Sequence, residues 1–172
     1  LGEKLWDTIC SFGKKYNLRP GAPNLIDRIE AGLLSFGNDM TSENSPLECG
    51  FEKYCALSSD IDFIGKAKLK SEKNIGPKLK LCGIAFGGEA QSACTIPWPI
   101  YFNNLKIGEI TSGIYNPSLK VNTGIALVMT ENLDKFRTVK VKALNSKITE
   151  GVICSLPFTI SKNYELINQI RY

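Results

Sequence analysis

The sequence predicts an α+β protein in which a helical N-terminal portion is followed by a C-terminal antiparallel β-barrel. Up to about residue 75, apolar residues recur at the spacing of a helix. After "NIGPKLK" the chain changes to short segments that are rich in β-branched residues and are separated by turn signals. Six such segments in about 80 residues favour a small antiparallel barrel or sandwich, and we predict the barrel.

The first segment is predicted to be an amphipathic helix over residues 2–16. It carries no capping residue, and the chain opens directly into it with Leu1. The simplest explanation is that an N-terminal part of the protein is missing. The apolar positions recur at i, i+4, i+8 and i+11, with Trp6 beside them, and comprise Leu1, Leu5, Ile9 and Phe12.

A second helix is predicted after the turn signal "NLRPGAPN", with Asn24 as its N-cap and its end near Gly37. A polar loop follows, and "LECGFEKYCAL" is expected to include a short strand. A third, short helix is expected to start near Asp62, with Phe63 and Ile64 as its buried anchors. The apolar stripe of the second helix comprises Leu25, Ile26, Ile29, Leu33 and Leu34.

The predicted strands lie between residues 78 and 160. "RTVKVKAL" alternates strictly between polar and apolar residues, as a half-exposed strand does. "NNLKIG" predicts a hairpin turn. The six predicted segments are "KLKLCGIAFGG", "WPIYFNN", "LKIGEITSGI", "TGIALVMT", "FRTVKVKAL" and "GVICSLPFTI".

The composition excludes several classes of site. None of the 172 residues is a histidine, which removes the commonest general base and the commonest metal ligand. The six cysteines form no CxxC pair, so we predict no metal site and interpret those in apolar runs as small buried hydrophobes of a reduced, cytoplasmic protein. The net charge of +4 is spread along the chain, which predicts no nucleic-acid partner. No apolar run approaches a membrane span of about 20 residues.

Glu30 is the acidic residue that the helical pattern explains least. It lies beside Ile29 at the edge of the apolar stripe, and small residues, Ala31 and Gly32, follow it. From the residues alone two interpretations stay open. Glu30 is either a solvated charge, paired with Arg28 or another neighbour, or a carboxylate that is held for a ligand.

An ordered series of sequence blocks resembles the T-protein (aminomethyltransferase) of the glycine cleavage system and its relatives. The blocks are "RIEAGLLSFGNDM", "SPLECGF", "DFIGKAKL", "GEITSGIYNPSLKVNTGIALV" and "SLPF". They cover essentially the whole chain, which corresponds to the C-terminal half of the family. Within the superfamily, "PNLIDRIEAGLLSFGND" looks closest to dimethylsulfoniopropionate demethylase.

The resemblance implies a fold in which three domains surround a folate cavity. Residues 1–18 would be the last helix of the ferredoxin-like second domain. Residues 19–77 would be the C-terminal part of the folate-binding first domain, and residues 78–172 the β-barrel. The family's catalytic aspartate lies in the half that we expect to be missing. We therefore expect no catalytic residue in this chain and no activity from the chain alone.

The resemblance also implies a cofactor site for tetrahydrofolate. Glu30 matches the family glutamate that hydrogen-bonds the pterin ring. Phe36, Asn38, Asp39 and Trp98 are further candidates. Packing is the alternative for both aromatic residues, and orienting the cavity loop or capping the helix end is the alternative for Asn38 and Asp39.

Three further residues are considered beside these candidates. Lys53 is a substitute for an arginine that the family uses toward the folate tail and that is absent from "KYCALSSDID". Tyr115 and Asn116 are interpreted as support for the cavity rather than as site residues.

The implied function is transfer of a methyl group from a small sulfonium donor to tetrahydrofolate, in the manner of the demethylase. The alternatives are an aminomethyltransferase, whose donor sits on a lipoyl carrier protein, a non-catalytic folate-binding relative, and the C-terminal module of a larger flavoenzyme. The partners expected under the first interpretation are the methyl donor and the missing N-terminal half of the same protein. No membrane partner is expected.

Overall fold

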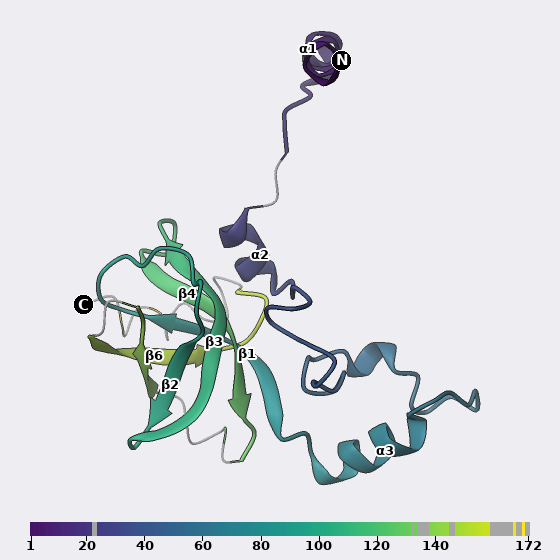
Figure 1. Ribbon diagram of the computed structural model, residues 1–172, viewed down its shortest axis with the longest axis vertical. Coiled ribbons are helices and arrows are strands. Elements are labelled where there is room, and N and C mark those ends of the chain that lie inside the picture. Colours follow the sequence, from purple (N-terminus) through teal and green to yellow (C-terminus); the bar gives the residue numbers. More distant parts are fainter. Residues whose placement is uncertain are drawn as a thin grey trace.

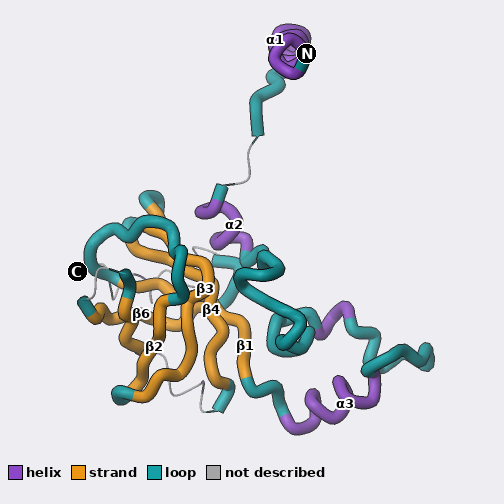
Figure 2. The backbone as a smooth tube through the Cα atoms, in the orientation of Figure 1, coloured by secondary structure: helices purple, strands orange, loops and turns teal. Residues whose placement is uncertain are grey.

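The computed structural model describes residues 1–21, 24–131, 133, 138–144, 147–158, 167 and 170. Its helices are α1 (Gly2–Gly13), η1 (Lys14–Tyr16), α2 (Leu25–Ala31), η2 (Glu52–Tyr54) and α3 (Lys66–Ile75). Its strands are β1 (Leu79–Phe86), β2 (Trp98–Phe102), β3 (Leu105–Asn116), β4 (Val121–Met129), β5 (Thr138–Lys142) and β6 (Ile148–Cys154). The predicted order of helices followed by strands is confirmed (Figures 1 and 2).

The first helix was predicted with nearly correct bounds. Residues 2–16 are helical as α1 and η1, and no side chain caps the start of α1. The helix stands apart from the barrel (Figure 1). Its apolar residues, among them Trp6 and Phe12, are accordingly exposed. They find no partner because no other described element lies against this helix.

The second helix is shorter than its apolar stripe predicted. Asn24 caps it as expected, because its side-chain oxygen accepts a hydrogen bond from the backbone N–H of Asp27 at 2.8 Å. The helix ends at Ala31 instead of near Gly37. Gly32 adopts a left-handed conformation (φ 68°), and the N–H of Leu33 bonds back to the carbonyl of Arg28 at 3.0 Å. This is the hydrogen bond of a Schellman motif, which terminates the helix.

The third helix begins four residues later than the sequence predicted. Gly65 (φ 92°) precedes Lys66, the first residue of α3. Phe63 is half-buried, but Ile64 is fully exposed, so its predicted role as an anchor is wrong. Lys66 is buried instead, and its ammonium donates to the carbonyls of Ser59 and Ile61 at 2.5 Å each. The strand expected in "LECGFEKYCAL" is also wrong, since this stretch holds the turn η2.

All six predicted strands are present and form a closed antiparallel barrel in the order β1-β4-β3-β2-β5-β6. Pairing of β1 with β6 closes it, with Gly83 opposite Cys154. The predicted hairpin turn joins β2 to β3 through Asn103 and Asn104, which both have positive φ (47° and 65°), as a tight two-residue turn requires. The barrel prediction is thus confirmed.

Two apolar clusters stabilise the barrel, one on each side of its wall. The inner cluster contains Phe86 and Trp98, whose rings meet edge to face with centroids 5.8 Å apart. The outer cluster joins Ile29 of α2 to buried residues of β1, β4 and β6. Because Ile29 is fully buried there, α2 is held against the outside of the barrel. This contact places the residues at the end of α2 next to β3.

Candidate functional site

Glu30 lies in the last turn of α2 and is fixed to the barrel at two points. Its side-chain Oε1 accepts a hydrogen bond from Asn116 Nδ2 at 2.5 Å. Its backbone carbonyl accepts one from the N–H of Phe158 at 2.8 Å. The side chain is half-buried, so Glu30 is not the freely solvated charge of the first interpretation.

Asn116, the last residue of β3, uses both ends of its side chain. Oδ1 accepts hydrogen bonds from the backbone N–H groups of Ser118 and Leu119, at 3.0 Å each. Nδ2 donates to Glu30, and the whole residue is inaccessible to solvent. Among the described residues, Asn116 is the one that contacts the Glu30 carboxylate. Within the described part of the chain, no donor bonds the second oxygen, Oε2.

Arg28 does not pair with Glu30. The two residues are two positions apart on α2 and so project from different faces of the helix. The Arg28 guanidinium instead forms an ion pair with Asp39, with 2.6 Å between Nη1 and Oδ2. It also donates to the carbonyl of Leu33 at 2.8 Å and to the hydroxyl of Ser112 at 2.5 Å. Arg28 therefore links the end of α2 and the following loop to β3.

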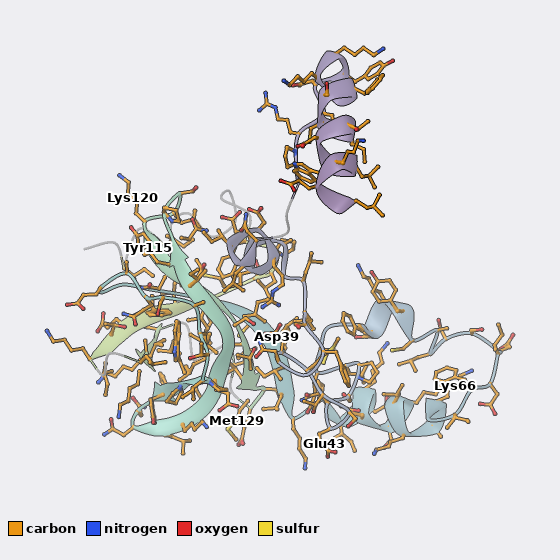
Figure 3. The ribbon with its side chains drawn as sticks, turned by 45° about the horizontal axis from the view of Figure 1, so that its top comes forward. Asp39, Glu43, Lys66, Tyr115, Lys120 and Met129 are labelled. Carbon is orange, nitrogen blue, oxygen red and sulfur yellow. The ribbon has the colours of Figure 1, made fainter. Side chains whose placement is uncertain are left out.

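Asp39 is 1% exposed and lies where the loop after α2 meets the barrel (Figure 3). Besides Arg28, its carboxylate accepts hydrogen bonds from the N–H of Ser35 (2.8 Å) and the hydroxyls of Thr111 (2.7 Å) and Ser112 (2.5 Å). Burial alone would raise the pKa of Asp39, but these donors outweigh it and hold the pKa below its ordinary value. Asp39 thus remains ionised at neutral pH and orients the loop.

Asn38, the other polar candidate in this loop, also contacts β3. Its amide donates to the carbonyl of Thr111 at 3.1 Å and to the hydroxyl of Ser112 at 2.7 Å. Neither Asn38 nor Asp39 bonds a backbone group of α2 as a cap would. Of the two alternatives in the sequence, the geometry favours orientation of the loop. Their predicted contact with folate stays a prediction.

The two small residues after Glu30 have different surroundings. Ala31 is exposed. Gly32 has φ 68°, and a Cβ at this position would lie 3.1 Å from the Cβ of Leu156. Helix termination and close packing against Leu156 therefore explain Gly32, without a ligand that approaches the backbone.

The two aromatic candidates lie in opposite environments. Phe36 is 73% exposed, so it does not pack against the described part of the chain, and its predicted contact with folate stays untested. Trp98 is 2% exposed, which confirms the expectation that it is an anchor of the barrel core. Gly113 allows this packing, because a Cβ there would lie 2.6 Å from the indole ring. The predicted stacking of Trp98 on folate has no exposed ring face to support it.

Lys53 and Tyr115 are not brought to Glu30 by any hydrogen bond. The Lys53 ammonium lies 4.8 Å from the centre of the Tyr54 ring and is exposed. Tyr115 is half-buried on β3, and its N–H donates to the carbonyl of Gln91 at 3.1 Å. The role of Lys53 toward the folate tail stays a prediction.

A hollow of about 360 Å³ lies beside the buried carboxylate of Asp39. Glu30 is not among its lining residues. The lining comes from the 38–44 loop and from β1, β3 and β4, and includes Asn38, Thr41, Lys106, Glu109 and Thr111. The hollow and the Glu30 carboxylate are thus separate features.

The cysteines are free thiols in a largely apolar setting. Burial raises the pKa of Cys82 and of Cys154 to about 12, so both stay protonated at neutral pH. Within the ranges that the structure describes, no three Cys, Asp or Glu side chains are grouped as metal ligands would be. No helix in the same ranges is long and apolar enough to cross a membrane.

Comparison with known proteins identifies the class of the barrel. Residues 80–159 match the family described as the glycine cleavage T-protein C-terminal barrel domain. The barrel thus matches this family, and the resemblance found in the sequence is confirmed.

Relatives of two kinds are similar to this chain in sequence. The chain is 41% identical over 128 residues to the dimethylsulfoniopropionate demethylase of Ruegeria pomeroyi, a match that covers 74% of this chain and 34% of the relative. It is 33% identical over 167 residues to an aminomethyltransferase of Thermoanaerobacter, covering 94% of this chain and 43% of the relative. The chain therefore spans well under half the length of these relatives.

A solved structure supports the fold. The glycine cleavage system aminomethyltransferase T from Bartonella henselae superposes with a TM-score of 0.59 at 21% identity, over 77% of this chain and 37% of that one. At this identity the likeness concerns the fold, in agreement with the closed barrel.

The roles of Arg28, Thr111 and Ser112 in this region were not predicted from the sequence. Arg28 was considered only as a partner of Glu30. One signal was available: Arg28 lies one residue before Ile29 of the apolar stripe, so its side chain starts close to the packed face. The partners on β3 had no such signal, because they are more than 70 residues away in the chain.

Proposed function

We propose that the chain is the C-terminal part of a tetrahydrofolate-dependent one-carbon transferase, and that the reaction is removal of a methyl group from dimethylsulfoniopropionate. The observation that carries the proposal is the carboxylate of Glu30, which Asn116 holds through one oxygen while the other is left for a ligand. The 41% identity to a dimethylsulfoniopropionate demethylase supports the choice of donor. A cytoplasmic location is part of the same proposal.

In this proposal Glu30 orients the pterin ring of tetrahydrofolate. The ring N–H and the exocyclic amine of a pterin form an edge with two donors. Oε2 and the remaining lone pair of Oε1 can accept both in charge-assisted hydrogen bonds. The Glu30 carboxylate supplies the acceptor, and its attachment to both α2 and β3 limits its movement. The folate ring would then be held against the junction of the helix and the barrel.

The methyl transfer itself needs chiefly alignment of its reactants. The bond between sulfur and the methyl carbon breaks while a bond from N5 of the folate to that carbon forms. The electron pair stays on sulfur, which becomes a neutral thioether, and N5 releases its proton. Because the sulfonium charge already activates the methyl group, holding the two reactants together supplies the main effect, about 7–11 kcal/mol for well-aligned groups.

The second candidate is an aminomethyltransferase whose donor is carried on a lipoyl protein. The match to a relative of that name over 94% of this chain favours it. A folate-binding relative without transfer activity is the non-enzymatic alternative. The three differ in what they consume: a free sulfonium compound, an aminomethyl group on a protein, or no donor at all.

The deciding experiment uses the full-length protein that contains this chain. It is incubated with tetrahydrofolate and either dimethylsulfoniopropionate or an aminomethylated lipoyl carrier protein, and the folate products are separated by chromatography. We expect methyltetrahydrofolate and the demethylated thioether from the first mixture and no turnover by the chain alone. Methylenetetrahydrofolate from the second mixture only would establish the aminomethyltransferase, and folate binding without either product the non-catalytic relative.

A further inference from the structure

The contact between Asn116 and Glu30 joins residues that are 86 positions apart in the chain. It connects the last turn of α2 with the end of β3. Both residues are restrained by the fold. Glu30 belongs to α2, which is packed on the barrel through Ile29, and Asn116 belongs to a strand that is paired with β4. The hydrogen bond is thus formed between two positioned groups rather than two mobile side chains.

The orientation of the Asn116 amide is determined by its own turn. Oδ1 accepts from the N–H groups of Ser118 and Leu119, which only an oxygen can do. A rotated amide would lose both hydrogen bonds and would turn its oxygen toward the carboxylate of Glu30. These two hydrogen bonds therefore fix the amide with its donor, Nδ2, toward Glu30.

We propose that Asn116 is a positioning residue for the pterin-binding glutamate, an inference that rests on the proposed function. It holds Oε1 of Glu30 and so directs Oε2 toward the folate. Its buried amide, which is inaccessible to solvent, also excludes water from that side of the carboxylate. Asn116 touches neither folate nor the reacting atoms.

Two substitutions separate this role from support of the turn. In Asn116→Ser the hydroxyl still accepts from the backbone N–H two residues on, as serine does in turns, but is too short to reach Glu30. In Asn116→Asp one carboxylate oxygen still accepts from the turn. The other oxygen replaces the Nδ2 donor and faces the carboxylate of Glu30. Asn122→Ser is the matched control, because Asn122 is equally buried but bonds Gly87 and Glu89. It neighbours Asn116 across the β3–β4 pair, on the opposite face of the sheet.

The test is a double-mutant cycle on tetrahydrofolate affinity in the full-length protein, with thermal melts of every variant. We expect Asn116→Ser to weaken binding about tenfold, since a hydrogen bond to a charged group is lost, and Asn116→Asp to weaken it more. In a Glu30→Ala background, Asn116→Ser should change affinity by less than about twofold. Asn122→Ser should lower the melting temperature without changing affinity.

Three outcomes overturn the inference in distinguishable ways. Equal losses from Asn116→Ser with and without Glu30 would mean that Asn116 acts through the fold alone. A large loss in Glu30→Ala with none in Asn116→Ser would leave the proposed function standing and refute the positioning role. Unchanged affinity in Glu30→Ala itself would refute the pterin contact, and the positioning role with it.

Discussion

The side chains of Arg28 and Asp39 form a buried ion pair, with 2.6 Å between Nη1 and Oδ2, that fastens the loop after α2 to the barrel. The side chain of Asp39 is closed off from solvent (0% exposed), whereas that of Arg28 is partly exposed (22%). Donors from Ser35, Thr111 and Ser112 complete the shell of the carboxylate. Because these groups come from three segments, the pair determines how the Glu30 helix sits on β3.

Replacement of Asp39 should destabilise the chain strongly. In Asp39→Ala the partly buried Arg28 guanidinium loses its counter-charge. The hydroxyls of Thr111 and Ser112 lose the acceptor to which they donate. Loss of one partner of a buried pair costs about 3–5 kcal/mol. Urea unfolding of this chain measures the change. Glu43→Ala, an exposed acid in the same loop, is the control and should cost less than about 0.5 kcal/mol; equal effects of the two substitutions would contradict the assignment.

The contribution of Asp39 should disappear in acid. Its pKa in the folded chain is held below the ordinary value of about 3.9. The stabilisation is therefore fully present above about pH 4 and is lost as the pH falls through the lowered pKa. The difference in unfolding free energy between wild type and Asp39→Asn should be constant from pH 5 to 7 and shrink below about pH 4. A difference that grew on acidification would have the wrong sign.

Glu30→Ala in the full-length protein should weaken tetrahydrofolate binding with little effect on folding. Removal of a charged partner from buried ring donors costs about 1.5–3 kcal/mol, or roughly ten- to a hundred-fold in affinity. Glu30→Gln should also bind poorly, because its amide offers one acceptor and turns two donors toward the ring edge. Titration calorimetry and thermal melts measure the two effects. Wild-type affinity in Glu30→Ala would return Glu30 to a structural role.

Gly32→Ala should cost more stability than Gly37→Ala. Both glycines have positive φ, 68° and 87°, so each substitution carries a backbone cost of about 1–2 kcal/mol. A Cβ at Gly32 would also press on Leu156, whereas nothing lies within 4 Å at Gly37. The comparison of the two unfolding free energies therefore isolates the packing of the α2 terminus on the barrel. Equal costs would show that Leu156 moves aside freely.

Trp98→Ala should unfold the barrel far more readily than Trp6→Ala. Trp98 fills the inner cluster, and truncation of a buried aromatic residue costs about 3–5 kcal/mol. Trp6 is exposed on α1, where its loss in this chain should stay within about 0.5 kcal/mol. Urea unfolding followed by circular dichroism distinguishes the two. A small effect of Trp98→Ala would contradict its place in the core.

The sequence by itself determined the order and type of the main elements. The six strands were predictable because β-branched runs between turn signals need only local information, and the two asparagines of the β2–β3 turn are such a signal. The first helix and the Asn24 cap were predictable for the same reason. The resemblance, carried by the ordered blocks, pointed to Glu30, for which helical periodicity alone left two interpretations open.

Only the tertiary structure decided what holds Glu30 and where the second helix ends. The apolar stripe continues through Leu33 and Leu34, so helical periodicity did not place the end of the helix at Ala31; contact of Gly32 with Leu156 accompanies that end. Arg28, Asp39 and Glu30 each bond a residue of β3 that lies 72 to 86 positions further along the chain. Such pairings depend on how the closed barrel and α2 are packed together, because hydrogen bonds between distant segments leave no period or spacing in the chain.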